Sequence, residues 1–320
     1  MEPVIEVTGL SKKFGGKEVL HGVDFNVPTG SIFGVIGPNG AGKTTIMRCL
    51  LDVIRPSSGT LRVLGQNPTR GGPALRRRIG YLPGELILEG RTTGRRILEH
   101  FAAVSGPVRQ GMVDSLAERL DLDLDNQARR LSKGNKQKLG LVQAFMHEPE
   151  LLVLDEPTSG LDPLRQQEFL ALIREAKDNG QTVFLSSHVL SEIQQAADEV
   201  AILREGSIVT VSTVDHLRES AIRHVRVLFP GDDIQSARAR CAEIPGISNL
   251  EVRQAHDGSD SPVIEGRASI EGPVEPLVQA LSKTRFLDLV IEEPDLEESV
   301  LKMYSADPAD KTPTRRGGSK

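Results

Sequence analysis

The stretch of residues 37–45 has the residue types and the spacing of a loop that binds phosphate. It fits the pattern G-x-x-x-x-G-K-S/T through Gly37, Gly42, Lys43 and Thr44. Glycine lets the backbone curl so that successive N–H groups point at phosphate oxygens. The lysine can reach the β- and γ-phosphates of a nucleotide, and the threonine hydroxyl can ligate Mg²⁺. The residues expected to bind nucleotide in this loop are Gly37, Pro38, Asn39, Gly40, Ala41, Gly42, Lys43, Thr44 and Thr45.

The segments on either side of this loop supply the context that such a loop requires. Residues 32–36 are an apolar run that predicts a buried strand, and residues 46–51 predict a helix. A helix that starts at the loop adds the positive end of its dipole to the phosphate site. The strand, the loop and the helix together favour a nucleotide site over a simple glycine-rich turn.

A second group of chemical side chains follows two further runs that predict buried strands. Asp155 and Glu156 come directly after residues 151–154, and His188 follows residues 182–187. Ligands of open α/β sheets bind at the carboxyl ends of the strands, so these side chains are expected at one edge. There Asp155 would hold Mg²⁺ and Glu156 would act as general base for an attacking water. His188 would bond the γ-phosphate or that water.

Two further residues each allow two interpretations from the local sequence. Phe14 is a lone aromatic residue in a polar segment, so it could stack on an adenine ring or anchor the core. Ser132 is expected to cap a helix that runs to about His147. The free N–H groups at that helix start could bind an anion, or the helix could simply be capped.

Composition narrows the classes of partner. The net charge of −5 gives no electrostatic reason to expect nucleic acid as the main ligand. The two cysteines, Cys49 and Cys241, are too few for a disulfide framework or a zinc site, which suits a protein of the reducing cytosol. We expect both side chains to be buried in the protein as small hydrophobic groups. We expect no signal peptide, because the polar start has no basic-then-apolar pattern. No apolar run is long enough to cross a bilayer, so work at a membrane would require docking to another chain.

The predicted fold class is α/β, with a helical insertion in the first domain. Residues 1–220 are expected to form the nucleotide-binding domain, and apolar residues at helical spacing place a helical subdomain at about residues 85–147. Residues 10–16 and 66–73 are expected to be loops.

The remaining third of the chain predicts a small α+β domain. Residues 221–305 show the order β-α-β-β-α-β of a ferredoxin-like domain, with a final helix at residues 294–304. A regulatory or dimer-stabilising domain and a passive extension both remain open. Residues 306–320 are rich in Pro, Gly and basic residues and are expected to be disordered.

The ordered set of motifs resembles the ATP-binding subunit of an ABC transporter, and the resemblance covers about residues 4–217. The features that carry it are Phe14 and His188 with residues 37–45, 131–139, 151–156 and 159–162. Lys133-Gly134, residues 81–85 and the C-terminal extension are most similar to the bacterial ABC-2 exporter branch. That branch includes drug and antibiotic self-resistance systems.

The resemblance implies a P-loop ATPase domain with a mixed sheet, which works with ATP and Mg²⁺. It implies that two copies sandwich two ATP molecules, each held between the phosphate loop of one copy and Ser132 and Gly134 of the other. It implies that Phe14 stacks on adenine and that Asp162 belongs to the loop that couples the two sites. A multi-span membrane permease would be the partner, which places this chain at the cytoplasmic face of the membrane.

The sequence departs from the family pattern at two places. Lys133 and Asn135 replace a glycine and a glutamine of the usual signature, while Gly134 still permits close backbone approach. Gly84 and Glu85 stand where the family usually has a glutamine, and Glu85 could approach Mg²⁺ in its place. Because Glu156 and His188 are intact, the sequence predicts a site that hydrolyses ATP.

An exporter ATPase is therefore the leading hypothesis from the sequence. A soluble ABC-type ATPase that acts on DNA or ribosomes is the alternative from another class, but the chain has neither heptads nor a second phosphate loop. The presence of Glu156 disfavours a third possibility, a non-hydrolysing ATP sensor.

Overall fold

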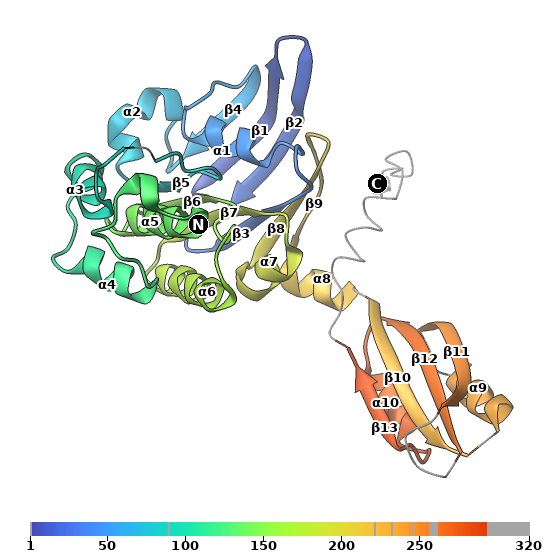
Figure 1. Cartoon of the computed structure of the whole chain (residues 1–320). Helices are drawn as coiled ribbons and strands as arrows, with labels where there is room; N and C mark the ends of the chain where they lie inside the picture. The colour runs from blue at the N-terminus through green and yellow to red at the C-terminus, as the bar shows by residue number, and fades with distance from the viewer. Residues whose placement is uncertain are drawn as a thin grey trace, which may run out of the picture. The chain divides into compact units, whose positions relative to one another are not determined.

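The computed structural model of the protein describes residues 2–292, apart from residues 89, 221, 232, 243, 245 and 256–261. Contacts divide the chain into two compact units, Met1–Val214 and Asp215–Lys320 (Figure 1). The expected helix at residues 294–304 and the expected disordered tail at residues 306–320 lie outside the described residues.

The larger unit is built on a six-stranded mixed sheet with the strand order β5-β6-β7-β3-β8-β9. Its strands are β3 (Ile32–Ile36), β5 (Ile79–Leu82), β6 (Leu151–Asp155), β7 (Thr182–Ser187), β8 (Glu199–Arg204) and β9 (Ser207–Thr213). All pair in parallel except β9, which is antiparallel to β8. Strands β3, β6 and β7 are buried along their whole length, as expected for parallel strands covered on both faces. Their carboxyl ends meet at one edge of the sheet.

A second, antiparallel sheet contains β2 (Lys17–Val27), β1 (Ile5–Phe14) and β4 (Ser58–Val63) in that order. The prediction of a loop at residues 10–16 was wrong, because β1 continues to Phe14 and pairs with β2. Gly9, with φ 59, lies beside register shifts that absorb the irregularity. The core between the sheets includes Phe25, which stacks on Phe33 and on Phe184 at ring centroid distances of 5.7 Å.

Helices α1 (Lys43–Leu50), α2 (Pro68–Arg76), α6 (Pro163–Asp178) and α7 (Leu190–Ala196) also belong to this unit. The prediction of a loop at residues 66–73 was wrong, because α2 begins at Pro68. The Asn67 side chain accepts hydrogen bonds from the Thr69 and Arg70 N–H groups, and proline suits the first helical turn. Gly72 and Pro73 interrupt the helix and hid it from pattern reading.

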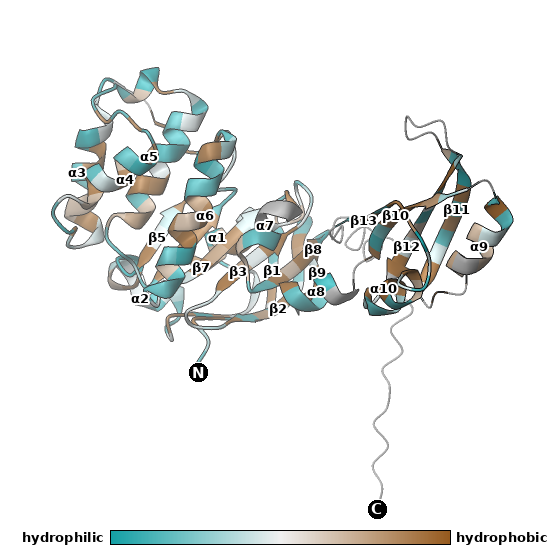
Figure 2. Cartoon of the chain, turned by 90° about the horizontal axis from the view of Figure 1, so that it is seen from below, coloured by the Kyte–Doolittle hydropathy of each residue, from teal (hydrophilic) through white to brown (hydrophobic). Residues whose placement is uncertain are grey.

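The helical insertion between β5 and β6 contains α3 (Gly94–Ser105), α4 (Met112–Arg119), the 3₁₀ turn Ala128–Arg130 and α5 (Lys133–Phe145). Figure 2 shows α3, α4 and α5 gathered at one end of the larger unit, each with hydrophilic and hydrophobic stretches. Arg119 of α4 ties the insertion to α6: its Nε donates to Glu168 at 2.6 Å, and its Nη atoms donate to Glu175 at 2.7 Å.

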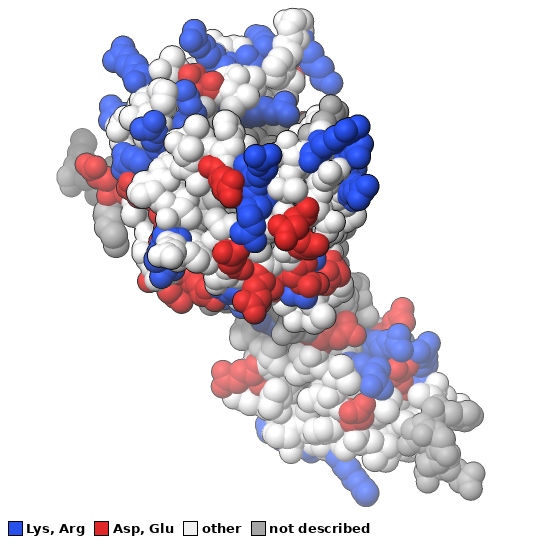
Figure 3. Space-filling model, turned by 60° about the vertical axis from the view of Figure 1, so that its left-hand side comes forward, with Lys and Arg blue, Asp and Glu red and all other residues white. Residues whose placement is uncertain are grey.

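Charge is unevenly spread over the face of the larger unit that Figure 3 draws. Figure 3 shows Lys and Arg concentrated at the height of α2 and more Asp and Glu at the height of α4 and α6. Arg119 of α4 pairs with two glutamates of α6, Glu168 and Glu175. Within the described residues, no helix has both the length and the apolar composition needed to cross a bilayer.

The smaller unit begins in α8 (Val214–Ser220) and has the expected order β-α-β-β-α-β. Its elements are β10 (Ile222–Pro230), α9 (Ile234–Ala242), β11 (Ile247–Ala255), β12 (Val263–Glu271), α10 (Glu275–Leu281) and β13 (Asp288–Ile291). The sheet is antiparallel with the order β11-β12-β10-β13. This arrangement confirms the ferredoxin-like prediction. A separate core that includes Phe229, Ile264 and Leu277 holds the helices against the sheet.

Both cysteines are free and buried, as predicted. Cys49 lies on α1 and Cys241 lies on α9.

Candidate functional site

The phosphate loop leaves the carboxyl end of the buried strand β3 and enters α1 at Lys43. Gly42 has φ 112, a conformation that disfavours any residue with a side chain. A Cβ atom added at Gly37 would lie 2.3 Å from the Leu203 carbonyl oxygen, so the backbone there has no room for one. These two glycines are therefore required by the path of the loop and not only by the motif.

Lys43 is a buried cation at the start of α1, with 6% of its surface exposed. Its Nζ donates to the Gly37 carbonyl oxygen at 2.6 Å and lies 3.2 Å from Glu156 Oε1. A buried ammonium group needs such partners, because removing it from water is costly. The ammonium group therefore lies between the phosphate loop and the glutamate that follows β6.

Asp155 ends β6 and is almost fully buried, with 1% exposed. Its Oδ2 accepts a hydrogen bond from Thr44 Oγ1 at 2.7 Å, and its Oδ1 accepts one from Ser186 Oγ at 2.6 Å. A hydroxyl and a carboxylate side by side are the hard oxygen donors that suit Mg²⁺. Among the described residues, no group of three or more His, Cys, Asp or Glu side chains is arranged to hold a metal alone. The donor set therefore fits an ion that also takes oxygens from phosphate and water.

Glu156 lies between two basic groups at the sheet edge. Its Oε2 lies 2.6 Å from Nδ1 of His188, and its Oε1 forms the ion pair with Lys43 without hydrogen-bond geometry. Glu156 has φ 49, a left-handed conformation that is uncommon for a residue with a side chain. The structure thus brings together the lysine, the glutamate and the histidine that the sequence placed at one edge.

Ser132 caps α5, because its Oγ accepts a hydrogen bond from the Asn135 N–H at 3.2 Å. The next two residues lie against the loop that follows Glu156. Lys133 Nζ donates to Ser159 Oγ at 3.1 Å, and a Cβ atom at Gly134 would lie 2.5 Å from the Gly160 carbonyl oxygen. The start of α5 and this loop are therefore in direct contact within one chain.

Three other predicted residues lie around this centre. Phe14 ends β1 with 48% of its surface exposed and with Lys12 Nζ 4.8 Å from its ring centroid, so it does not anchor the core. Asp162 caps α6 and accepts a hydrogen bond from the Arg165 N–H at 3.1 Å. Glu85 is exposed, whereas Gly84 lies against Asp155: a Cβ atom at Gly84 would be 3.0 Å from Asp155 Oδ2.

Sequence reasoning missed three residues of this region. Ser186 bonds Asp155 and also accepts a hydrogen bond from the Glu156 N–H at 3.0 Å. Gln137 on α5 bonds the backbone that follows β6. Burial raises the pKa of the Tyr81 phenol on β5, and the charge of Asp155 raises it further, whereas Arg48 lowers it. The available signal was the polar type of Ser186 directly after the apolar run of β7, whereas Gln137 lies in a polar stretch of α5 that gives no such signal.

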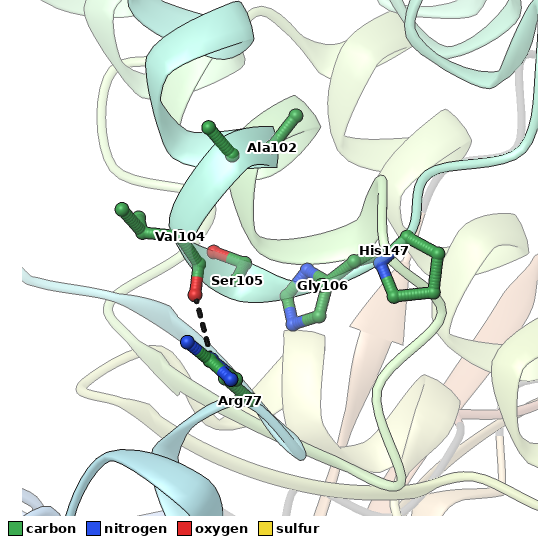
Figure 4. Close-up of a pocket in the computed structure, with 8 residues that line it drawn as sticks. Arg77, Ala102, Val104, Ser105, Gly106 and His147 are labelled. Atoms are coloured by element: carbon green, nitrogen blue, oxygen red, sulfur yellow. Dashed lines mark hydrogen bonds between the residues drawn. The ribbon is translucent and has the colours of Figure 1, made fainter.

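A pocket of about 550 Å³ lies at the opposite, amino-terminal edge of β5 and β6. It is lined by Arg77, Ala102, Ala103, Val104, Ser105, Gly106, Pro107 and His147. Figure 4 shows Arg77 bonded to the Val104 carbonyl oxygen, and Nε donates there at 3.2 Å. Burial lowers the pKa of His147. This pocket shares no residue with the phosphate edge.

Comparisons with known proteins agree with this geometry. A family model described as ABC transporter matches residues 20–159. The chain is 38% identical over 222 residues to the bacitracin transport ATP-binding protein BcrA of Bacillus licheniformis, which covers 68% of this chain and 72% of the relative. It is 32% identical over 312 residues to the daunorubicin resistance ATP-binding protein DrrA3 of Streptomyces coeruleorubidus, and the match covers 96% of this chain and 97% of the relative. A solved structure of the ATP-binding subunit of an ABC transporter superposes with a TM-score of 0.63 at 31% identity, covering 67% of this chain and 92% of that chain.

Proposed function

The chain belongs to the ABC transporter family as an ATP-binding subunit with ATPase activity, and from this premise we propose that it powers a membrane exporter through Glu156-dependent hydrolysis. The observation that carries the proposal is the position of the Glu156 carboxylate, 3.2 Å from Lys43 and 2.6 Å from His188. A carboxylate at the end of a central strand, beside the phosphate loop, is placed to take a proton from an attacking water. His188 orients that carboxylate and bonds the water or the γ-phosphate.

Lys43 is the group that must change partners when nucleotide binds. Its ammonium is held by the Gly37 carbonyl oxygen and by Glu156, and phosphate oxygens would compete with Glu156 for it. The loop N–H groups and the start of α1 add positive potential to the same place. The residues that would hold Mg²⁺ are Thr44 and Asp155, and the ion would neutralise charge on the phosphates. Glu85 is exposed in this structure, so we propose it only as a residue that approaches the metal site.

The second half of the site comes from another copy of the chain. Ser132 and Gly134 are placed at the start of α5, where helix N–H groups favour an anion, and we propose that this anion is the γ-phosphate held by the partner copy. Phe14 is half exposed and has Lys12 Nζ over its ring, so we propose that the ring face that Lys12 does not cover stacks on adenine. Asp162 belongs to the loop that contacts the start of α5, which suits a role in coupling the two sites. ATP would then close a homodimer, and hydrolysis would release it.

The transport role rests on the relatives. Two of its relatives are named for bacitracin transport and for daunorubicin resistance, and the second one aligns with nearly the whole of this chain. We propose that this chain likewise drives export of a drug or antibiotic through a multi-span permease. In that assembly it would sit at the cytoplasmic face of the membrane through the permease.

Replacing the base is the direct test. Glu156→Gln keeps the size of the side chain but not its basicity, and we expect turnover to fall by about 10²- to 10⁴-fold. ATP-dependent dimerisation, followed by size-exclusion chromatography with light scattering, should persist. Glu150→Gln is the matched control, because Glu150 is an exposed acid that pairs with Arg78. It directly precedes the amino-terminal end of β6, whereas Glu156 follows the carboxyl end. Unchanged turnover in Glu156→Gln would remove Glu156 as the base.

A further inference from the structure

Gln137 is a buried polar residue on α5, with 3% of its surface exposed. Its side-chain Nε2 donates to the Glu156 carbonyl oxygen at 3.0 Å and to the Pro157 carbonyl oxygen at 3.1 Å. Both neighbours are acceptors, so only the NH₂ side of the amide can face them. The orientation of this amide is therefore fixed by its surroundings.

The backbone that Gln137 holds is one that the sequence alone disfavours. Glu156 has φ 49 although it carries a side chain, and it directly precedes Pro157. A left-handed conformation is costly for such a residue, and a following proline restricts its backbone further. Conformations of this kind persist only where the surrounding structure fixes them.

Glu156 is fixed from both sides. Its N–H donates to Ser186 Oγ at 3.0 Å, and its carbonyl oxygen accepts from Gln137 and from the Ser159 N–H at 3.1 Å. The two peptide groups that flank Glu156 determine the direction of its Cα–Cβ bond. They therefore determine whether its carboxylate lies between Lys43 and His188.

The same face of α5 makes the other contacts to this loop. Lys133 bonds Ser159, and Gln137 is four residues further along the helix, which places both side chains on one face. Gly134 lies against Gly160 between them. The helix and the catalytic loop therefore meet along a continuous contact.

We propose that Gln137 is a positioning residue for ATP hydrolysis, which holds the Glu156 backbone so that the carboxylate can act as base. The proposal rests on the function proposed above for Glu156. It has a further consequence, because α5 begins with the residues proposed to bind the partner's ATP. A shift of α5 on capture of that nucleotide would reach the Glu156 of the same chain through Gln137, so one helix would serve two ATP sites.

The test removes the amide donors and keeps the shape. Gln137→Met is close in size and suits a helix. We expect kcat to fall by about 10- to 100-fold, since a small misplacement of a catalytic group costs about that much. The affinity for a fluorescent ATP analogue should stay within about twofold, because Gln137 contacts none of the phosphate loop residues named above. Gln143→Met is the matched control, because Gln143 is a half-buried glutamine on the same helix. The kcat of this variant should equal that of the wild type.

A second variant keeps the test decisive if Gln137→Met does not fold. Gln137→Asn retains the amide but shortens its reach, so it should give a smaller loss of kcat at unchanged ATP affinity. A loss of ATP affinity that matches the loss of kcat, or an unchanged kcat in a folded Gln137→Met protein, would overturn the positioning role.

The double variant separates positioning from a general loss of structure. In a Glu156→Gln background, Gln137→Met should cause no further decrease in single-turnover hydrolysis of radiolabelled ATP, because the group that it positions is gone. A further decrease of the same size would mean that Gln137 acts independently of Glu156. If Glu156→Gln alone retained turnover, the proposed base would be wrong, and that result is distinct from a failure of Gln137.

Discussion

The phosphate edge of the larger unit and the sheet of the smaller unit each hold a buried carboxylate, but the hydrogen-bond donors around Asp155 are uncharged and those around Glu265 are charged. Asp155 is held by the hydroxyl groups of Thr44 and Ser186. Glu265, on β12 with 6% exposed, accepts charge-assisted hydrogen bonds from Arg253 at 2.8 Å and from Arg267 at 3.0 Å.

The difference decides what each carboxylate can do. A hydroxyl can exchange a hydrogen bond for a metal ion or water at small cost, whereas two guanidinium groups occupy both oxygens of Glu265 with strong, directed bonds. A buried acid therefore marks a reactive site only where its partners leave it available. Glu265 and Arg267 of β12 form an ion-pair cluster with Arg253 of β11, and this cluster holds the two strands together.

Among the variants that test this comparison, Lys43→Ala at the phosphate edge is expected to have the largest effect. Charge-assisted hydrogen bonds are worth about 1.5–3 kcal/mol, so ATP affinity measured by calorimetry should weaken by roughly 10- to 150-fold. Lys138→Ala is the control, since Lys138 is an equally buried lysine, 7% exposed, whose Nζ bonds the Asp121 carbonyl oxygen instead. Unaltered nucleotide affinity in Lys43→Ala would contradict the phosphate-loop assignment.

A smaller effect of another kind is expected from Glu265→Gln. The variant keeps the shape of the side chain but removes the carboxylate that Arg253 and Arg267 share. We expect a loss of about 1–3 kcal/mol in the free energy of unfolding, measured in urea, with ATP turnover unchanged. If turnover dropped as far as in Glu156→Gln, the two carboxylates could not be divided into a reactive and a structural one.

The smallest effect is a pH dependence that belongs to the smaller unit. Burial raises the pKa of Glu265, but the hydrogen bonds from Arg267 and Arg253 outweigh it and hold the pKa below its ordinary value. A lowered pKa contributes stability that is present above about pH 4.3 and is lost as the pH falls through the folded value. The difference in melting temperature between the wild type and Glu265→Gln should therefore narrow from pH 6 to pH 3. A difference that stays constant would mean that the charge of Glu265 contributes nothing.

The local parts of the site could be predicted from the sequence. The phosphate loop is a continuous stretch whose glycines are required by its own backbone, and Asp155, Glu156 and His188 each follow a strand of a parallel sheet. A parallel sheet brings such positions to one edge without any knowledge of side-chain contacts. The βαββαβ order of the smaller unit could also be predicted, because each of its helices and strands has its own periodicity of apolar residues.

The supporting residues could not be predicted, because they are distant in sequence. Ser186 lies 30 residues from Glu156 and Gln137 lies 19 residues from it, so no local pattern links them. The extension of β1 to Phe14 was missed because pairing with β2 overrides the glycine that breaks the alternation. Helix α2 was missed because its capping residue, Asn67, lies outside the apolar pattern. Gly72 and Pro73, which disfavour helix, also lie within it.

Because both native cysteines are buried, we expect neither to react readily with thiol-specific reagents. Burial raises the pKa of Cys49 to about 11, although Lys12 opposes the shift. Only the thiolate reacts, so this raised pKa keeps Cys49 in the unreactive thiol form at neutral pH, and the surrounding core shields the sulfur. Cys241 is enclosed in the smaller unit. A reporter thiol placed at an exposed position, such as Leu164 with 69% exposed, would therefore label selectively without removal of either native cysteine.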